Sequence, residues 1–190
     1  MITMLVGMLL FFGVHSVSIV APGWRDGVAS RIGDIRWKLV YSVVSLLGFF
    51  LMVTGYAALR LEPHIVYLPP VGLRHVAALL MLPVFPLLLA AYLPGRLQRM
   101  AKHPMLVAVK FWALSHLLAN GMLADVLLFG GFLVWAVADR ISLKRRTERP
   151  RPMAPSSAIN DVIAVLGGLA LYAAFIMGWH QRLFGVAPFG

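Results

Sequence analysis

Residues 102–146 of the chain read KHPMLVAVKFWALSHLLANGMLADVLLFGGFLVWAVADRISLKRR. Two apolar runs are joined in this stretch by the dipeptide Asn120-Gly121, which is a typical turn sequence. Pro104 follows a histidine at the start of the first run, in the first helical position, where proline is well tolerated. A basic cluster follows the second run. The stretch therefore predicts a compact helical hairpin, with the other apolar segments packed around it.

The composition of the chain is typical of a membrane protein. Of its 190 residues, 61% are hydrophobic and 13% are charged, whereas soluble domains are about half apolar and a quarter charged. The absence of cysteine excludes disulfides, thiolate chemistry and Cys-ligated metal centres. The net charge of +10 comes from Lys and Arg residues that lie between the apolar runs, a distribution that argues against nucleic-acid binding.

Six apolar segments each approach the roughly 20 residues that a membrane-spanning helix requires. We therefore expect an all-α, polytopic helical bundle that forms a single transmembrane domain over residues 1–190. The first segment has neither a basic N-terminal region nor a small-residue cleavage site, so we expect a retained helix and not a signal peptide. The expected spans are 2–21, 38–59, 73–93, 104–119, 122–139 and 159–179.

The positively charged residues predict the orientation of these spans. Linkers 21–38, 94–110 and 140–157 carry four, four and six Lys and Arg residues. The segments on the opposite side carry only three. Because Lys and Arg are enriched in cytoplasmic loops, we expect these three linkers in the cytoplasm, both termini in the periplasm and the protein in the bacterial cytoplasmic (inner) membrane.

Several local features accompany this topology. Residues 21–37 mix tryptophan and aliphatic residues with charges, which is typical of a short interfacial helix. Pro83 and Pro86 predict a kink or a break in the third span. The stretch 147–157 is a polar linker broken by prolines. Asp161 stands at the start of the last span, where a carboxylate stabilises the helix dipole.

Ionisable residues inside apolar runs are site candidates, because burying them in a bilayer is costly. His15 lies in the first span and His103 at the start of the fourth, and the predicted topology puts both in the cytoplasmic half of the membrane. Two facing imidazoles could be axial ligands of a haem or ligands of a metal ion. The alternative is a helix–helix hydrogen bond at His15 and an interfacial histidine at His103.

Lys110 lies seven residues after His103 and so returns to nearly the same helix face, about 10 Å deeper. It could bind an anionic group such as a haem propionate, pair with Asp139, or extend to the cytoplasmic surface.

A second set of polar residues falls near the outer surface. These residues could form a polar cluster, or could simply provide hydrogen bonds that close the hairpin. His64 and His180 fall in outer segments and are expected to be solvated. The predicted outer cluster consists of His75, His116, Asn120 and Asp125.

The hairpin resembles the NnrU family of bacterial membrane proteins. The similarity includes KHPMLVAVKFWALSHLLANG and DVLLFGGFLVWAVADRISLKRR, and extends to WKLVYSVVSLLGF, HVAALLMLPVF, AAYLPGR, Asn160-Asp161 and WHQRLFGVAP. The resemblance implies a link to denitrification, through the expression or activity of nitrite and nitric oxide reductases as partners. It also implies a relation to the plant 15-cis-zeta-carotene isomerase, which uses haem b.

The relation to the isomerase implies haem ligands at His15 and His103 of this chain. The chain departs from the isomerase in having no cysteine for ligand exchange, which puts carotenoid isomerisation in doubt. We therefore expect a haem-dependent redox, sensing or isomerase-like role. The alternatives are a scaffold or assembly factor without a cofactor, and a small-molecule carrier, for which the only support is the proline-interrupted third span.

Overall fold

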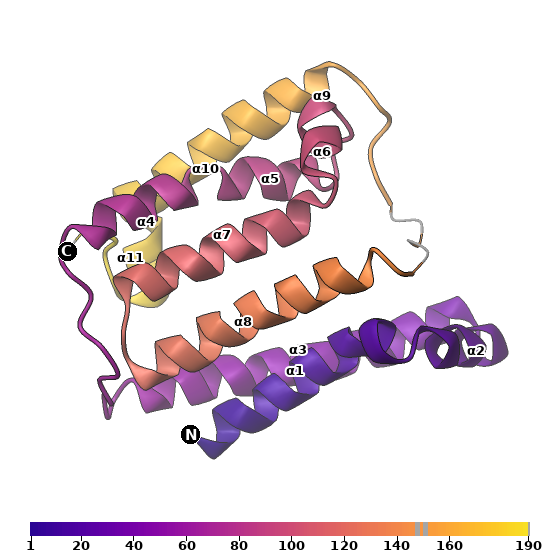
Figure 1. The fold of residues 1–190 in the computed structure, drawn as a ribbon, viewed down its shortest axis with the longest axis horizontal. Coiled ribbons are helices and arrows are strands. Elements are labelled where there is room, and N and C mark those ends of the chain that lie inside the picture. The colour runs from indigo at the N-terminus through magenta and orange to yellow at the C-terminus, as the bar shows by residue number, and fades with distance from the viewer. Residues whose placement is uncertain (147–148, 150–151, 190) are drawn as a thin grey trace. The chain divides into compact units, whose positions relative to one another are not determined.

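The computed structural model describes residues 1–146, 149 and 152–189, and all the regular elements in these ranges are helices (Figure 1). The chain forms two compact units, each built from two separate stretches of sequence. Unit 1 comprises Met1–Val66 and Met122–Thr147, and unit 2 comprises Tyr67–Gly121 and Glu148–Gly190. The turn of the 102–146 hairpin therefore coincides with the boundary between the two units.

Unit 1 contains two long antiparallel helices, a short connecting helix and the second half of the hairpin. The connecting helix begins at a proline in its first turn and ends at Gly33, whose φ of +91° favours glycine. It lies within the segment predicted to form a short helix. The elements are α1 (Ile2–Val20), α2 (Pro22–Ile32), α3 (Asp34–Leu59) and α8 (Leu123–Ser142).

Glycines allow α1 and α3 to pack side by side at very short range (Figure 1). A Cβ atom on Gly7 would lie 2.2 Å from the backbone N of Met52, and one on Gly55 would lie 2.3 Å from the backbone N of Met4. Met4 and Met52 are 0% and 1% exposed. Only glycine permits this approach of the two backbones, and the methionines fill the remaining space.

Unit 2 contains the first half of the hairpin and the last apolar segment. Its long helix α7 packs along α4 and α5 (Figure 1). The last segment alternates α-helical and π-helical turns. The elements are α4 (Leu73–Met81), α5 (Val84–Ala90), α6 (Arg96–Ala101), α7 (Pro104–Ala119), α9 (Ile159–Val162), η1 (Ile163–Gly167), α10 (Gly168–Ala174), η2 (Phe175–Trp179) and α11 (His180–Phe184).

The third apolar segment is interrupted where its prolines predicted a break. Helix α4 ends at Met81, and α5 begins at Val84. Pro83 has no N–H to donate, and the neighbouring Leu82 N–H donates to the Leu79 carbonyl at 3.3 Å, three residues back. Regular α-helical bonding resumes with Leu87 N–H and the Pro83 carbonyl at 3.0 Å.

Asp161 lies in the first turn of α9, as expected, but its carboxylate stabilises a different helix. Its two oxygens accept hydrogen bonds from the backbone N–H groups of Arg96 and Leu97, at 2.8 and 2.9 Å. These are unpaired donors of the first turn of α6. The neighbouring Asn160 side chain donates to the carbonyls of Pro94 and Pro155, at 2.8 and 2.9 Å. The pair thus ties the start of α9 to the loop before α6.

Parts of the polar linker predicted at 147–157, residues 147–148 and 150–151, lie outside the described residues. Residues 152–157 form no helix or strand, and Ala154 N–H donates to the Tyr92 carbonyl at 3.0 Å.

Four helical segments in the described part of the chain are long and apolar enough to cross a membrane: Ile2–Val20, Asp34–Leu61, Leu73–Ala90 and Ile159–Phe184. Many of their apolar side chains are exposed, for example Leu46 at 67% and Phe50 at 63%. Exposed apolar surface of this extent is typical of helices that face lipid. The protein is therefore a helical membrane protein.

The two helices of the hairpin fall outside that set of four for different reasons. Helix α7 has only 16 residues. Helix α8 has 20 residues, but three of them, Asp125, Asp139 and Arg140, are charged.

Candidate functional site

His15 lies on α1 in unit 1, surrounded by aromatic rings. Its Nδ1 lies 2.7 Å from the Phe11 carbonyl oxygen, and its ring stacks on the Phe11 ring with centroids 4.1 Å apart. Tyr41 and Trp135 approach the same ring, with centroids at 5.1 and 5.8 Å. A carbonyl can only accept a hydrogen bond, so Nδ1 carries the proton, and Nε2 has the lone pair that could bind a metal.

A buried polar atom lies beside this histidine. The indole of Trp135 meets the His15 ring edge to face, and its Nε1–H is buried without a hydrogen-bond partner among the described residues. Unpaired buried donors call for an explanation, and an absent ligand is one such explanation. The surroundings of His15 are therefore aromatic, with one unpaired indole donor beside the ring.

His103 and Lys110 belong to unit 2, where His103 precedes α7 as its N-cap residue. Both side chains are partly buried. Because His15 belongs to the other unit, the predicted pairing of His15 with His103 stays a prediction. Asp139, one of the partners considered for Lys110, has an ion-pair partner within its own unit, since Arg146 donates a hydrogen bond to its Oδ1.

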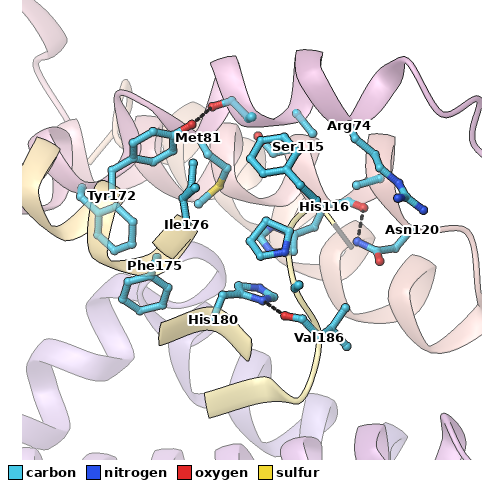
Figure 2. Close-up of a pocket in the computed structure, with 17 residues that line it drawn as sticks. Arg74, Met81, Ser115, His116, Asn120, Tyr172, Phe175, Ile176, His180 and Val186 are labelled. Atoms are coloured by element: carbon cyan, nitrogen blue, oxygen red, sulfur yellow. Dashed lines mark hydrogen bonds between the residues drawn. The ribbon is translucent and has the colours of Figure 1, made fainter. Parts of the chain in front are cut away.

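A cavity of about 180 Å³ opens within unit 2, between α4, α5, α7, the last helical segment and the chain that follows it (Figure 2). Most of its wall is apolar, with alanines, Met81, Phe85, Phe175 and Ile176. Its polar lining residues are Arg74, Ser115, His116, Asn120, Tyr172 and His180.

Two histidines lie next to each other on this cavity, as Figure 2 shows. The rings of His116 and His180 have centroids 6.3 Å apart. Each is oriented by a backbone carbonyl: Nδ1 of His116 lies 2.8 Å from Trp112 O, and Nδ1 of His180 lies 2.6 Å from Val186 O. By the argument used for His15, Nδ1 is protonated in both rings and Nε2 is an acceptor.

The other polar lining groups bond mainly to nearby backbone. Asn120 Nδ2 donates to the His116 carbonyl at 3.0 Å. The hydroxyl of Tyr67 donates to the carbonyls of Asn120, at 2.7 Å, and of Leu117. These bonds close the end of α7. Tyr172 donates to the Ala78 carbonyl at 2.9 Å and so joins the last segment to α4.

The predicted outer cluster is only partly assembled within either unit. His116 and Asn120 share the cavity. His75 is not among the lining residues, and its ring packs against Phe189. Asp125 belongs to unit 1, where it accepts a hydrogen bond from the Tyr56 hydroxyl at 2.6 Å and one from the Met122 N–H at 3.3 Å. The four-residue cluster as a whole stays a prediction.

His180, which was predicted to be solvated, is partly buried and lies on the cavity wall. The cause is a kink at Gly178, whose φ of +143° is essentially restricted to glycine and redirects the chain at the end of η2. In the sequence, the feature that could have indicated this kink is Gly178, which lies between an apolar run and His180. Among the described residues, no three His, Cys, Asp or Glu side chains group closely enough to hold a metal ion.

Comparison with known proteins gives a match at the level of a family. Searches of curated proteins and of solved structures found no match to the chain. A family model described as NnrU protein matches residues 3–188, nearly the whole chain. With its apolar helices and this match along almost its full length, the chain belongs to the NnrU family.

Proposed function

We propose that this protein is a six-span protein of the bacterial cytoplasmic membrane that binds haem b and supports nitrogen-oxide respiration. The main support for haem binding is the orientation of His15. Its Nδ1 is bonded to the Phe11 carbonyl, which leaves Nε2 as a potential ligand atom among aromatic rings.

The lengths of α7 and α8 support six spans in place of four. At about 1.5 Å per residue, the 16 residues of α7 extend roughly 24 Å, and the 20 residues of α8 extend roughly 30 Å. The hydrocarbon core of a bilayer is about 30 Å thick. The charges of α8 lie near its two ends, at Asp125 and at Asp139-Arg140, and the residues between them are uncharged.

Six spans and the distribution of Lys and Arg together support the proposed orientation. The three linkers rich in Lys and Arg fall on one side, and the cytoplasmic side is the one where such residues accumulate. Both termini then lie in the periplasm.

In the proposed site, His15 and His103 would hold the haem iron, each through a ring nitrogen. Lys110, two helical turns after His103, would neutralise a propionate. A bound haem b would supply a redox-active iron for electron transfer, nitric oxide sensing or isomerisation. The protein's own contribution is to hold the His15 ring in one tautomer, through Phe11, and to keep the face beside Phe11, Tyr41 and Trp135 apolar.

The link to respiration comes from the family, whose name associates it with denitrification. The partners would be the nitrite and nitric oxide reductases, whose expression or activity the protein would support.

Absorption spectra of the purified protein test the cofactor. The protein expressed with ample haem should show a Soret band, and α and β bands after reduction. His15→Ala and His103→Ala should each shift or abolish these bands, whereas His64→Ala, in an exposed loop, should leave them unchanged. A colourless parent protein that still supports reductase activity would contradict the cofactor and favour the scaffold alternative.

A further inference from the structure

The cavity of unit 2 has a largely apolar wall and a polar end that includes His116 and His180. Its volume of about 180 Å³ is slightly larger than an engineered cavity of about 150 Å³ that binds benzene. One substituted six-membered ring therefore fits, whereas a porphyrin, with four pyrrole rings around a metal, does not.

The polar end of the cavity determines which hydrogen-bonding group a ligand needs. The Nδ1 proton of His180 is donated to the Val186 carbonyl at 2.6 Å, so its Nε2 can only accept. His116 has the same tautomer through Trp112 O. A ligand group that binds Nε2 of His180 must donate a hydrogen bond, as a phenolic hydroxyl does and as a quinone carbonyl does not.

The backbone around His180 is shaped to build this end of the cavity. The π-helical turn η2 supplies Phe175 and Ile176 to the wall, and π-turns are frequent at functional sites. The kink at Gly178 follows, and a left-handed turn at Gly185, with φ of +75°, then brings Val186 back to His180. Two glycine conformations are thus combined to place one imidazole on the cavity.

The helices around the cavity indicate that a ligand can enter it from the membrane. Helices α4 and α5 and the last segment are candidate membrane spans, and the wall that they contribute is largely apolar. A ligand that enters this cavity through its apolar wall must dissolve in the bilayer.

We propose that this cavity binds a lipid-soluble quinol, with its ring against Met81, Phe85 and Phe175 and one hydroxyl group donating to Nε2 of His180. The proposal concerns binding only. It stands independently of the haem proposal, because each residue that it uses belongs to unit 2 and neither His15 nor His103 lines the cavity.

Binding of duroquinol to the purified full-length protein in lipid nanodiscs, measured by calorimetry under anaerobic conditions, tests the proposal. The matched probe is the dimethyl ether of duroquinol, which has the same ring and no hydrogen-bond donor. Duroquinol should bind about fivefold or more tightly than the ether, since an unpaired polar group left in an apolar site costs about that factor or more. Equal affinity of the two probes, or no binding of duroquinol, would overturn the proposal.

Variants locate the site. His180→Phe keeps a ring of similar size, removes the acceptor and should weaken duroquinol binding about tenfold. His64→Phe, the control, should leave it unchanged. Ala119→Leu should reduce the binding of both probes by filling the cavity, and unfolding temperatures identify any variant that fails to fold. Equal effects of His180→Phe and His64→Phe, or zinc binding to the two imidazoles without duroquinol binding, would contradict the assignment.

Discussion

At the scale of single residues, several charged side chains of the apolar segments have structural partners. Asp125, which is only 3% exposed, accepts hydrogen bonds from Tyr56 and from the start of its own helix. Asp139 pairs with Arg146, and Asp161 binds the N–H groups of α6. Asp125 and Asp161 therefore join different helices, whereas Asp139 pairs with a residue that follows the end of its own helix.

The hydrogen bond between Tyr56 and Asp125 joins α3 to α8. We expect Tyr56→Phe to lower the free energy of unfolding by about 1–3 kcal/mol, because it leaves one oxygen of a buried carboxylate unpaired. Denaturant unfolding in detergent, followed by circular dichroism, measures this change. Tyr92→Phe is the control, since Tyr92 is 53% exposed. In a double-mutant cycle with Asp125→Asn, strictly additive effects would rule out the coupling.

The Asp161 carboxylate should protect the first turn of α6. In Asp161→Ala, the amides of Arg96 and Leu97 lose their acceptor, and we expect their hydrogen exchange to accelerate. Asp161→Asn keeps one carbonyl acceptor and should show a smaller acceleration. Unchanged exchange at both amides in the alanine variant would contradict the capping role.

At the scale of secondary-structure elements, packing depends on where the backbones approach each other. Helices α1 and α3 touch through glycines, and Gly168 of α10 makes a similar contact, since a Cβ there would lie 2.3 Å from the N atom of Pro86. These contacts join segments far apart in the sequence, so the sequence shows the glycines without showing which of them lie in an interface.

Two glycines of α1 provide a matched pair. We expect Gly7→Ala to lower the free energy of unfolding by about 1–3 kcal/mol, because its Cβ would overlap the backbone of Met52 and force the two helices apart. Gly13→Ala should be neutral or stabilising, since nothing lies within 4 Å of its Cβ and alanine favours the helix. Thermal unfolding of the two variants in the same detergent compares them. The reverse order of stability would exclude the proposed packing of α1 against α3.

At the scale of the whole molecule, the central question is the number of spans. The absence of cysteine makes the chain suitable for labelling of single introduced cysteines. With six spans, His64→Cys and Leu123→Cys should react with an impermeant maleimide in intact spheroplasts. Ser30→Cys and Ser157→Cys should react only after lysis. Labelling of Leu123→Cys only after lysis would show that α7 and α8 do not cross the membrane as proposed.

Most of the architecture could be predicted from the sequence, because lipid imposes a simple rule on it. Backbone polar groups must be paired within the bilayer, so long apolar segments become helices. The break at Pro83 follows in the same way from the missing N–H of proline. The sequence likewise identified His15, His116 and Asn120 as polar residues in unusual places.

The tertiary structure decided which polar residues share a site. His116 comes from the hairpin and His180 from a later segment, and only the kink at Gly178 and the turn at Gly185 bring their rings within 6.3 Å. Asp161 stabilises α6, more than 60 residues away in the sequence, instead of acting only on its own helix. Helical periodicity is local and can be read from neighbouring residues. A cavity depends instead on the packing of distant segments and on backbone turns, and glycine makes the angles of these turns possible without determining them.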